Sequence, residues 1–165
     1  MIVATTSVLA VLATVSTVTQ TPAVPEDVTI TLERTACFGT CPVYVVTLDA
    51  RGHVDYNGIR FVRVTGRQTA RVPVSRVAAI LDRAEQIRFF ALNDRYREIR
   101  HPDGTTSTVT DLPTTFVTIK RAGRAKRVED YYGAPTELGD LERLIDEAAQ
   151  TRQWISTDDQ KPQPR

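Results

Sequence analysis

Few residues of this chain have types and spacing suited to chemistry, and the first are its only two cysteines, Cys37 and Cys41. A C-x-x-x-C loop closes into a disulfide when its α-carbons approach to about 4.4–6.8 Å, and Gly39 between them eases the turn. Two alternatives stay open. A redox-active pair would usually have C-x-x-C spacing and a nearby Lys or His, and a zinc site would need further ligands, for which His53 and His101 are the only imidazoles. We expect a structural disulfide, which an oxidising compartment favours.

Carboxylates form a second candidate site. Asp111, Glu129 and Asp130 stand at predicted strand ends, with Tyr131 beside the last two. Two carboxylates that meet in a cleft could act as general acid and base. The alternative is that Asp111 and Asp130 hold turns, and we favour it because no spacing forces the groups together. Neither histidine has a partner at a known motif spacing, so we expect surface or hydrogen-bonded imidazoles rather than a general base.

The charge distribution is a third lead. The net charge of +1 hides a basic middle, because residues 51–127 hold 16 Lys and Arg against 7 Asp and Glu. We expect two basic hairpins to form the contact surface for an anionic envelope component. Their residues are Arg60, Arg63, Arg67 and Arg71 in the first, and Arg124, Lys126 and Arg127 in the second. The alternative is that the acidic last helix lies over these hairpins. Nucleic acid is disfavoured, because only 7% of residues are aromatic and few stand near the arginines to stack on bases.

The elements that must position these residues follow from the periodicity. Alternating or β-branched runs predict seven strands, over 28–32, 43–48, 53–56, 61–65, 68–72, 114–120 and 125–129. Asn57-Gly58 is typical of a hairpin turn. Apolar residues at helical spacing predict one helix from Ser75 to Ile87 and another that opens at Pro135. The expected fold is α+β, an antiparallel meander of about six or seven strands with two amphipathic helices on one face. The chain has no glycine-rich phosphate loop, and we expect no cofactor.

The two ends differ from the rest. Residues 1–23 carry no charged side chain and contain a short apolar run, which predicts a signal peptide cleaved after Ala23. An uncleaved membrane anchor and an N-terminal strand are the alternatives. Residues 24–155 are predicted to form a single α+β domain, and the polar, proline-containing residues 156–165 a disordered tail.

Three segments resemble a known family. They are T-A-C-F-G-T-C-P-V-Y at Thr35–Tyr44, D-L-P-T-T at Asp111–Thr115 and E-D-Y-Y-G-A-P at Glu129–Pro135. These segments are similar to the bacterial family catalogued as domain of unknown function 6438. The resemblance implies a cell-envelope or secreted setting, and it brings no activity, cofactor or catalytic residue.

Together these observations predict an exported or periplasmic module that binds a partner or has a structural role. It would be monomeric, with no membrane span after processing and no nucleic-acid partner. The alternative is an envelope enzyme or thiol-redox protein that uses the Cys37/Cys41 loop or the carboxylates of Asp111 and Asp130.

Overall fold

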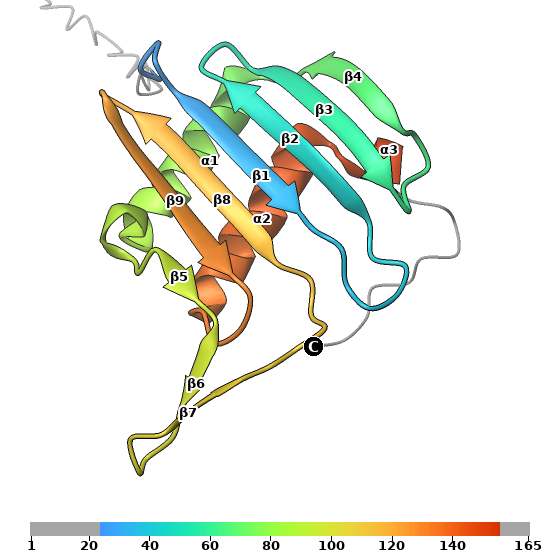
Figure 1. The fold of residues 1–165 in the computed structure, drawn as a ribbon. Coiled ribbons are helices and arrows are strands. Elements are labelled where there is room, and N and C mark those ends of the chain that lie inside the picture. Colours follow the sequence, from blue (N-terminus) through green and yellow to red (C-terminus); the bar gives the residue numbers. More distant parts are fainter. Residues whose placement is uncertain (1–23, 156–165) are drawn as a thin grey trace, which may run out of the picture.

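Residues 24–155 are described by the computed structural model, and they contain a seven-stranded sheet with helices on one face (Figure 1). In spatial order the strands are β4 (Gly66–Arg71), β3 (His53–Arg60), β2 (Val43–Asp49), β1 (Thr29–Arg34), β8 (Thr115–Arg121), β9 (Arg124–Asp130) and β5 (Arg95–Tyr96). Neighbours are antiparallel, except that the short edge strand β5 runs parallel to β9. The predicted α+β class and number of strands are confirmed.

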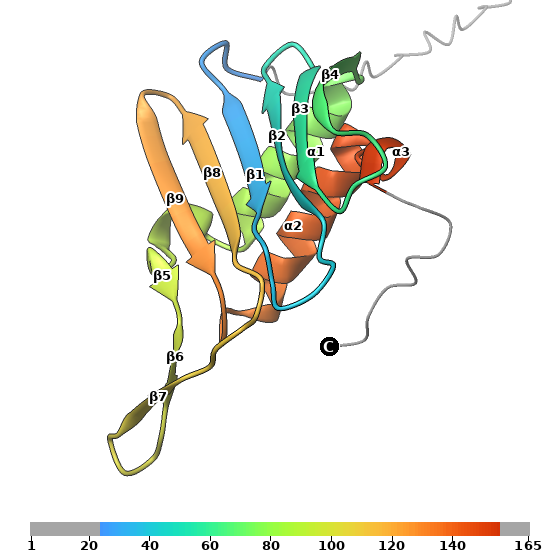
Figure 2. The same cartoon turned by 45° about the vertical axis from the view of Figure 1, so that its right-hand side comes forward.

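Two helices, α1 (Val74–Gln86) and α2 (Thr136–Ala149), cover the same face of the sheet (Figure 2). Strand residues alternate between the faces, so Ile30 and Leu32 of β1 are fully buried beneath the helices. Trp154, on the short helix α3 (Arg152–Ile155), folds back and stacks on Tyr56 with ring centroids 4.8 Å apart. The opposite face carries no helix and presents polar residues such as Thr31 and Thr47, whose hydroxyls are 3.0 Å apart.

The predicted turn at Asn57-Gly58 is wrong. β3 continues through both residues to Arg60, and the predicted strand over 61–65 is the loop between β3 and β4. Gly58 is needed for a different reason, because a β-carbon there would lie 2.1 Å from the carbonyl oxygen of Val64. The glycine therefore lets this loop approach the strand, and the first half of the chain holds four strands rather than five.

Two smaller expectations also differ. Ser75 is not the N-cap of α1, because the helix begins at Val74 after Pro73. After the 3-10 turn η1 (Phe89–Ala91), the polar stretch 93–112 holds β5 and a protruding hairpin of β6 (Glu98–Arg100) and β7 (Thr106–Thr108), seen at the bottom of Figure 1. The predicted signal peptide, residues 1–23, and the predicted tail, residues 156–165, lie outside the described residues. Within the described range no helix is both long and apolar enough to cross a membrane.

A polar cluster ties α2 to the sheet. Arg34 at the end of β1 donates to the Oδ2 of Asp146 on α2 at 2.8 Å and to Thr115 of β8 at 3.1 Å. Tyr44 donates to the Oδ1 of Asp146 at 2.6 Å and accepts a bond from Arg34. Burial lowers the pKa of the Arg34 guanidinium, but Asp146, Tyr44 and Glu142 together more than offset this and raise the pKa above its ordinary value. The guanidinium of Arg34 thus joins β1, β2, β8 and α2.

The two buried tyrosines of this region predict opposite effects when their hydroxyls are removed. The Tyr56 hydroxyl has no hydrogen-bond partner within residues 24–155, and burial raises the pKa of Tyr56 to about 12. We expect Tyr56→Phe to leave the free energy of unfolding unchanged or raise it by up to about 1 kcal/mol. Tyr44→Phe should lower it by about 1–3 kcal/mol, because Asp146 loses a donor. Urea unfolding of the two variants tests this, and equal losses would contradict it.

Candidate functional site

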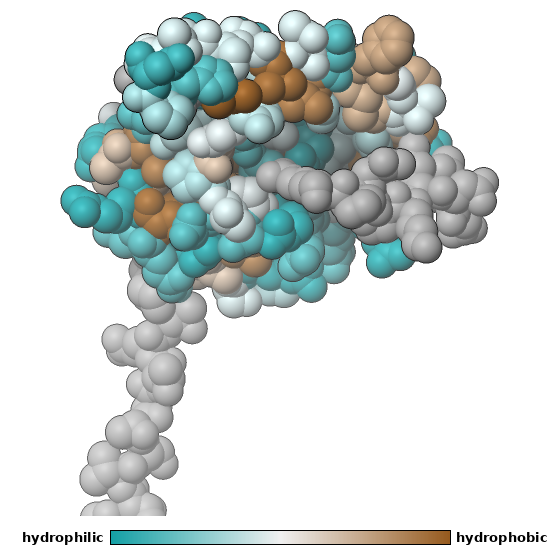
Figure 3. All heavy atoms as spheres, turned by 90° about the horizontal axis from the view of Figure 1, so that it is seen from below, coloured by the Kyte–Doolittle hydropathy of each residue, from teal (hydrophilic) through white to brown (hydrophobic). Residues whose placement is uncertain are grey.

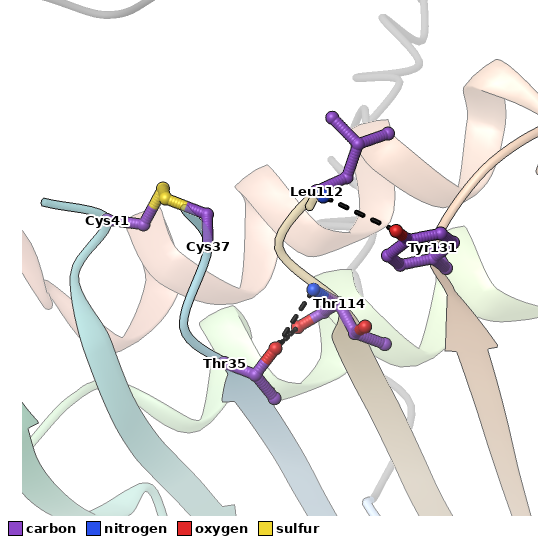
Figure 4. The surroundings of a disulfide bond; sticks show 6 residues. All are labelled: Thr35, Cys37, Cys41, Leu112, Thr114 and Tyr131. Atoms are coloured by element: carbon purple, nitrogen blue, oxygen red, sulfur yellow. Dashed lines mark hydrogen bonds between the residues drawn. A yellow bond between two sulfur atoms is a disulfide. The ribbon is translucent and has the colours of Figure 1, made fainter. Parts of the chain in front are cut away.

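The candidate site is the end of the sheet where the three motif segments meet (Figure 4). The backbone N–H and the hydroxyl of Thr35 both donate to the carbonyl oxygen of Thr114 at 3.0 Å. Thr114 returns a bond from its N–H to the Thr35 hydroxyl oxygen at 2.9 Å. The N–H of Phe38 donates to the carbonyl oxygen of Asp111 at 3.3 Å. The β1–β2 loop and the segment before β8 are therefore bound side by side, although 79 residues separate Thr35 from Thr114.

Cys37 and Cys41 form a disulfide with α-carbons 5.7 Å apart. The bond closes the β1–β2 loop, and the Gly39 N–H donates to the Cys37 carbonyl oxygen at 2.9 Å within it. Both sulfurs are occupied in this state, so the loop provides neither a thiolate nucleophile nor a pair of zinc ligands. The side chain at its tip, Phe38, is 90% exposed. The closed loop thus presents one aromatic ring to solvent.

Exposed apolar side chains gather at this end of the molecule, which Figure 3 shows from below with hydrophobic residues among polar ones. Four of them lie in connections between elements, and the fifth, Ile59, lies near the end of β3. The exposed large hydrophobic residues of this end are Phe38, Ile59, Phe61, Leu112 and Tyr132. The register of the sheet places them together, because Arg60 pairs with Val43 and Thr115 pairs with both Arg34 and Asp130.

The predicted carboxylates are not gathered into one group. Glu129 is buried on the helix-free face, and its two carboxylate oxygens bind Arg95 at 3.0 Å and Arg97 at 3.1 Å. Asp130 follows on the strand and so lies on the opposite, helix-bearing face of the sheet. The exposed Asp111 accepts a bond from the hydroxyl of its neighbour Thr110 at 3.0 Å. A pair of carboxylates sharing a cleft is therefore not formed by these three residues.

Tyr131 joins two parts of the site. Its hydroxyl oxygen accepts a bond from the N–H of Leu112 at 3.4 Å, as drawn in Figure 4. Its ring lies 5.2 Å from the guanidinium of Arg97, which also binds Glu129. Tyr131 thus holds the segment before β8 against the end of β9.

The two histidines lie on different hairpins, and the hairpin that carries His101 projects from the same end of the molecule as the β1–β2 loop (Figure 1). His53 is exposed on β3, with its Nε2 2.8 Å from a guanidinium nitrogen of Arg71 and its Nδ1 3.4 Å from Asp49. His101 is exposed beside the β6–β7 hairpin and lies 2.9 Å from the Ser107 hydroxyl.

The two basic hairpins lie near opposite edges of the sheet, one at β3–β4 and the other at β8–β9. In the second, Arg127 binds Glu33 at 2.9 Å and Lys126 binds Asp94. Arg124 stacks over the ring of Phe90 at 4.7 Å. In the first hairpin, five exposed arginines stand against the two carboxylates of Asp49 and Asp55. They are Arg51, Arg60, Arg63, Arg67 and Arg71.

The acidic helix α2 does not supply the partners that are seen at either hairpin. Its Asp146 binds Arg34 and its Asp140 binds Arg83 at 3.2 Å. The charges of the β8–β9 hairpin are met by residues of β1 and of the segment after η1. Internal pairing therefore occurs, but through other carboxylates than those of the last helix.

Several residues of this end were not found by sequence reasoning. Arg95 and Arg97, which bind Glu129, stand in the stretch that has no clear periodicity, so nothing in the spacing links them to β9. Phe38 carried a usable signal, because an aromatic residue inside a C-x-x-x-C loop has no strand or helix to bury it.

Comparison with known proteins gives one match. The family model described as "Domain of unknown function (DUF6438)" matches residues 28–149. The chain belongs to the DUF6438 family. The matched range begins beside β1 and ends with α2, so in this DUF6438 protein it includes every strand of the sheet and the polar cluster on Arg34. No curated protein matches the sequence.

The disulfide should contribute measurably to stability. Closing so short a loop restricts the unfolded chain by about 2 kcal/mol in the chain-entropy model. We expect the double variant Cys37→Ser/Cys41→Ser to lose about this much free energy of unfolding. Urea unfolding of the wild type with and without reductant should show the same difference. The double variant is the control, because its unfolding midpoint should not respond to reductant.

Proposed function

We propose that this protein is an exported cell-envelope module that binds an anionic polymer, phosphate- or carboxylate-bearing, along the β3–β4 edge of its sheet. One observation carries the proposal. Five exposed arginines face two carboxylates on this edge, and β4 is the last strand of the sheet on that side. A basic strip beside a free edge attracts a polyanion and leaves room for it to lie along the strand.

Arg67 is the arginine most available for a ligand, whereas Arg63 donates to the carbonyl oxygen of Gln153 and Arg71 lies 2.8 Å from His53 Nε2. The side chain of Arg67 is 76% exposed, and its partner Asp55, at 3.0 Å, is 45% exposed. Such solvated pairs contribute little stability, so the guanidinium can exchange its carboxylate for a ligand anion at small cost. Arg60 stands over the ring of Phe61 at 4.9 Å. The basic edge is thus continuous with the exposed apolar residues of the disulfide end.

The β8–β9 hairpin supports a different role. Its Arg127 and Lys126 are held by Glu33 and Asp94, and Arg127 also stacks on Phe116 at 4.0 Å. These contacts tie the hairpin to its neighbours. For this reason the proposal assigns the polymer to the β3–β4 edge alone.

Export is supported by the disulfide, because such bonds persist mainly in oxidising compartments. If the protein is exported with cleavage after Ala23, the mature chain should begin at Val24. Expression of the full chain with a C-terminal tag, cell fractionation and mass spectrometry of the purified protein test this. An intact Met1 in a cytoplasmic fraction, with both cysteines as free thiols, would contradict export.

Binding is tested with a phosphate-bearing polysaccharide and with the same polysaccharide after its phosphates are removed. We expect the triple variant Arg60→Gln/Arg67→Gln/Arg71→Gln to bind the first about tenfold more weakly, because three ion contacts of about 0.5 kcal/mol are lost. The affinity of the wild type should fall with added salt more steeply than that of the variant. Titration calorimetry at two salt concentrations measures both effects.

The matched control is Arg95→Gln/Lys120→Gln/Arg143→Gln, which removes the same charge away from the β3–β4 edge and from the cavity described below. It should keep the affinity of the wild type. The proposal fails if the two triple variants lose equal affinity, or if the dephosphorylated polysaccharide binds as tightly as the charged one.

A further inference from the structure

A cavity of about 410 Å³ lies at the end of the sheet opposite the disulfide. It opens between the C-terminal half of α1, the η1 turn and the turn between β8 and β9. Its volume falls within the range of small-molecule sites, about 300–1,000 Å³. None of the residues discussed for the polymer surface lines it, so it is a separate feature.

The floor of the cavity is apolar. Leu81 and Ala84 of α1, Phe89 of η1 and Ile119 of β8 line it, and all four are buried. The ring of Phe90 adds a partly exposed wall and meets the ring of Phe89 edge-on, with centroids 5.9 Å apart. These four residues are at most 5% exposed, so the accessible apolar surface of the cavity is the partly exposed ring of Phe90, where an apolar group of a ligand could pack without leaving polar atoms unpaired.

The rim of the cavity is basic. Three arginines line it, Arg88, Arg121 and Arg124, against the single carboxylate of Glu85. Glu85 binds Arg121 at 2.8 Å, and the guanidinium of Arg124 lies over the ring of Phe90 at 4.7 Å. Arg88 has no ion-pair partner among the residues that the structure describes. The rim thus carries an excess positive charge directly above an apolar floor.

Two residues of the cavity wall hold unfavourable backbone conformations. Arg88 has a φ of 54° and Ala122 a φ of 51°, in the left-handed region that favours glycine. Arg88 directly follows Ile87, the C-cap of α1. Glycine is the usual residue at the position that Arg88 occupies. Ala122 is held in its turn by Asp27, whose carboxylate accepts bonds from the N–H groups of Ala122 and Gly123. Strain of this kind collects at ligand sites, where a side chain is needed in spite of its backbone cost.

We propose that this cavity binds a small amphiphilic anion, with its apolar chain or ring against Phe90 and its carboxylate or phosphate between Arg88, Arg121 and Arg124. Charge complementarity selects the head group, because the rim has three guanidinium groups and one carboxylate. The ring of Phe90 selects against ions that lack an apolar part. A single-chain carboxylate such as decanoate satisfies both conditions.

The test uses decanoate with the whole protein and two glycine variants. Arg88→Gly removes a guanidinium and a strained backbone at once, so its melting temperature should rise while its affinity for decanoate falls about tenfold. Gln150→Gly is the matched control, because Gln150 is the left-handed C-cap of α2, with a φ of 57°, and does not line the cavity. It relieves the same kind of strain without removing a charge, so its melting temperature should also rise and its affinity should stay within about twofold of the wild type.

Probes that hold one half of the ligand separate the two contributions. Acetate and inorganic phosphate have no apolar chain, and decanol and decyltrimethylammonium lack the negative charge. All four should bind at least tenfold more weakly than decanoate in titration calorimetry. The inference is overturned if decanoate shows no saturable binding, if any of these probes matches it, or if both glycine variants keep the affinity of the wild type.

Binding of decanoate to the cavity can be tested separately from binding of the polymer to the β3–β4 edge. The triple variant Arg60→Gln/Arg67→Gln/Arg71→Gln lies outside the cavity and should bind decanoate as the wild type does. A loss of decanoate binding in that variant would overturn the assignment to this cavity. A loss of polysaccharide binding in it, with decanoate affinity unchanged, supports two separate sites.

Discussion

The contact between Arg34 and Asp146 is the interaction on which the disulfide end depends. Arg34 closes β1, and its guanidinium reaches Tyr44 of β2, Thr115 of β8 and Asp146 of α2. The side chains of Arg34 and Asp146 are 25% and 18% exposed, so removing one partner should cost less than the about 3–5 kcal/mol typical of a fully buried pair. Because a single group bonds three other elements, none of them can shift at this end without breaking a charged hydrogen bond. The helix and the central strands are therefore fixed relative to one another at the base of the motif loops.

Because the polar cluster around Arg34 fixes the ends of the β1–β2 loop, the disulfide has a second role besides stability. The loop that carries Phe38 leaves the sheet directly after Arg34 and returns directly before Tyr44. Both ends of the loop are thus held by the polar cluster, and the Cys37–Cys41 bond shortens the free part to a few residues. An exposed aromatic ring held this way loses little conformational entropy when a partner covers it. This preorganisation is consistent with the proposed binding surface, to which the basic β3–β4 edge would add charge.

The sequence predicted local features well and long-range ones poorly. The periodicity of β1, β2, β8 and α2 gave their positions within a few residues, because burial on one face imposes period 2 or 3.6. Asn57-Gly58 misled, since its glycine allows close approach of Val64 instead of a turn. The pairing of Arg34 with Asp146 spans 112 residues and leaves no mark in the local spacing. Such contacts follow only from the strand order, which places β1 between β2 and β8.

The strand order also decides which of the positive charges behind the near-zero net charge are neutralised by carboxylates. The two basic hairpins are alike in composition, but one packs beside β1 and the segment after η1, where Glu33 and Asp94 neutralise it. The other forms the far edge of the sheet, where only Asp49 and Asp55 face five arginines. Equal sequence patterns thus have unequal consequences, because a carboxylate neutralises the arginines that the topology brings to it. The two proposed anion sites both rest on an excess of arginine over carboxylate, at β3–β4 in one case and around Arg88 in the other.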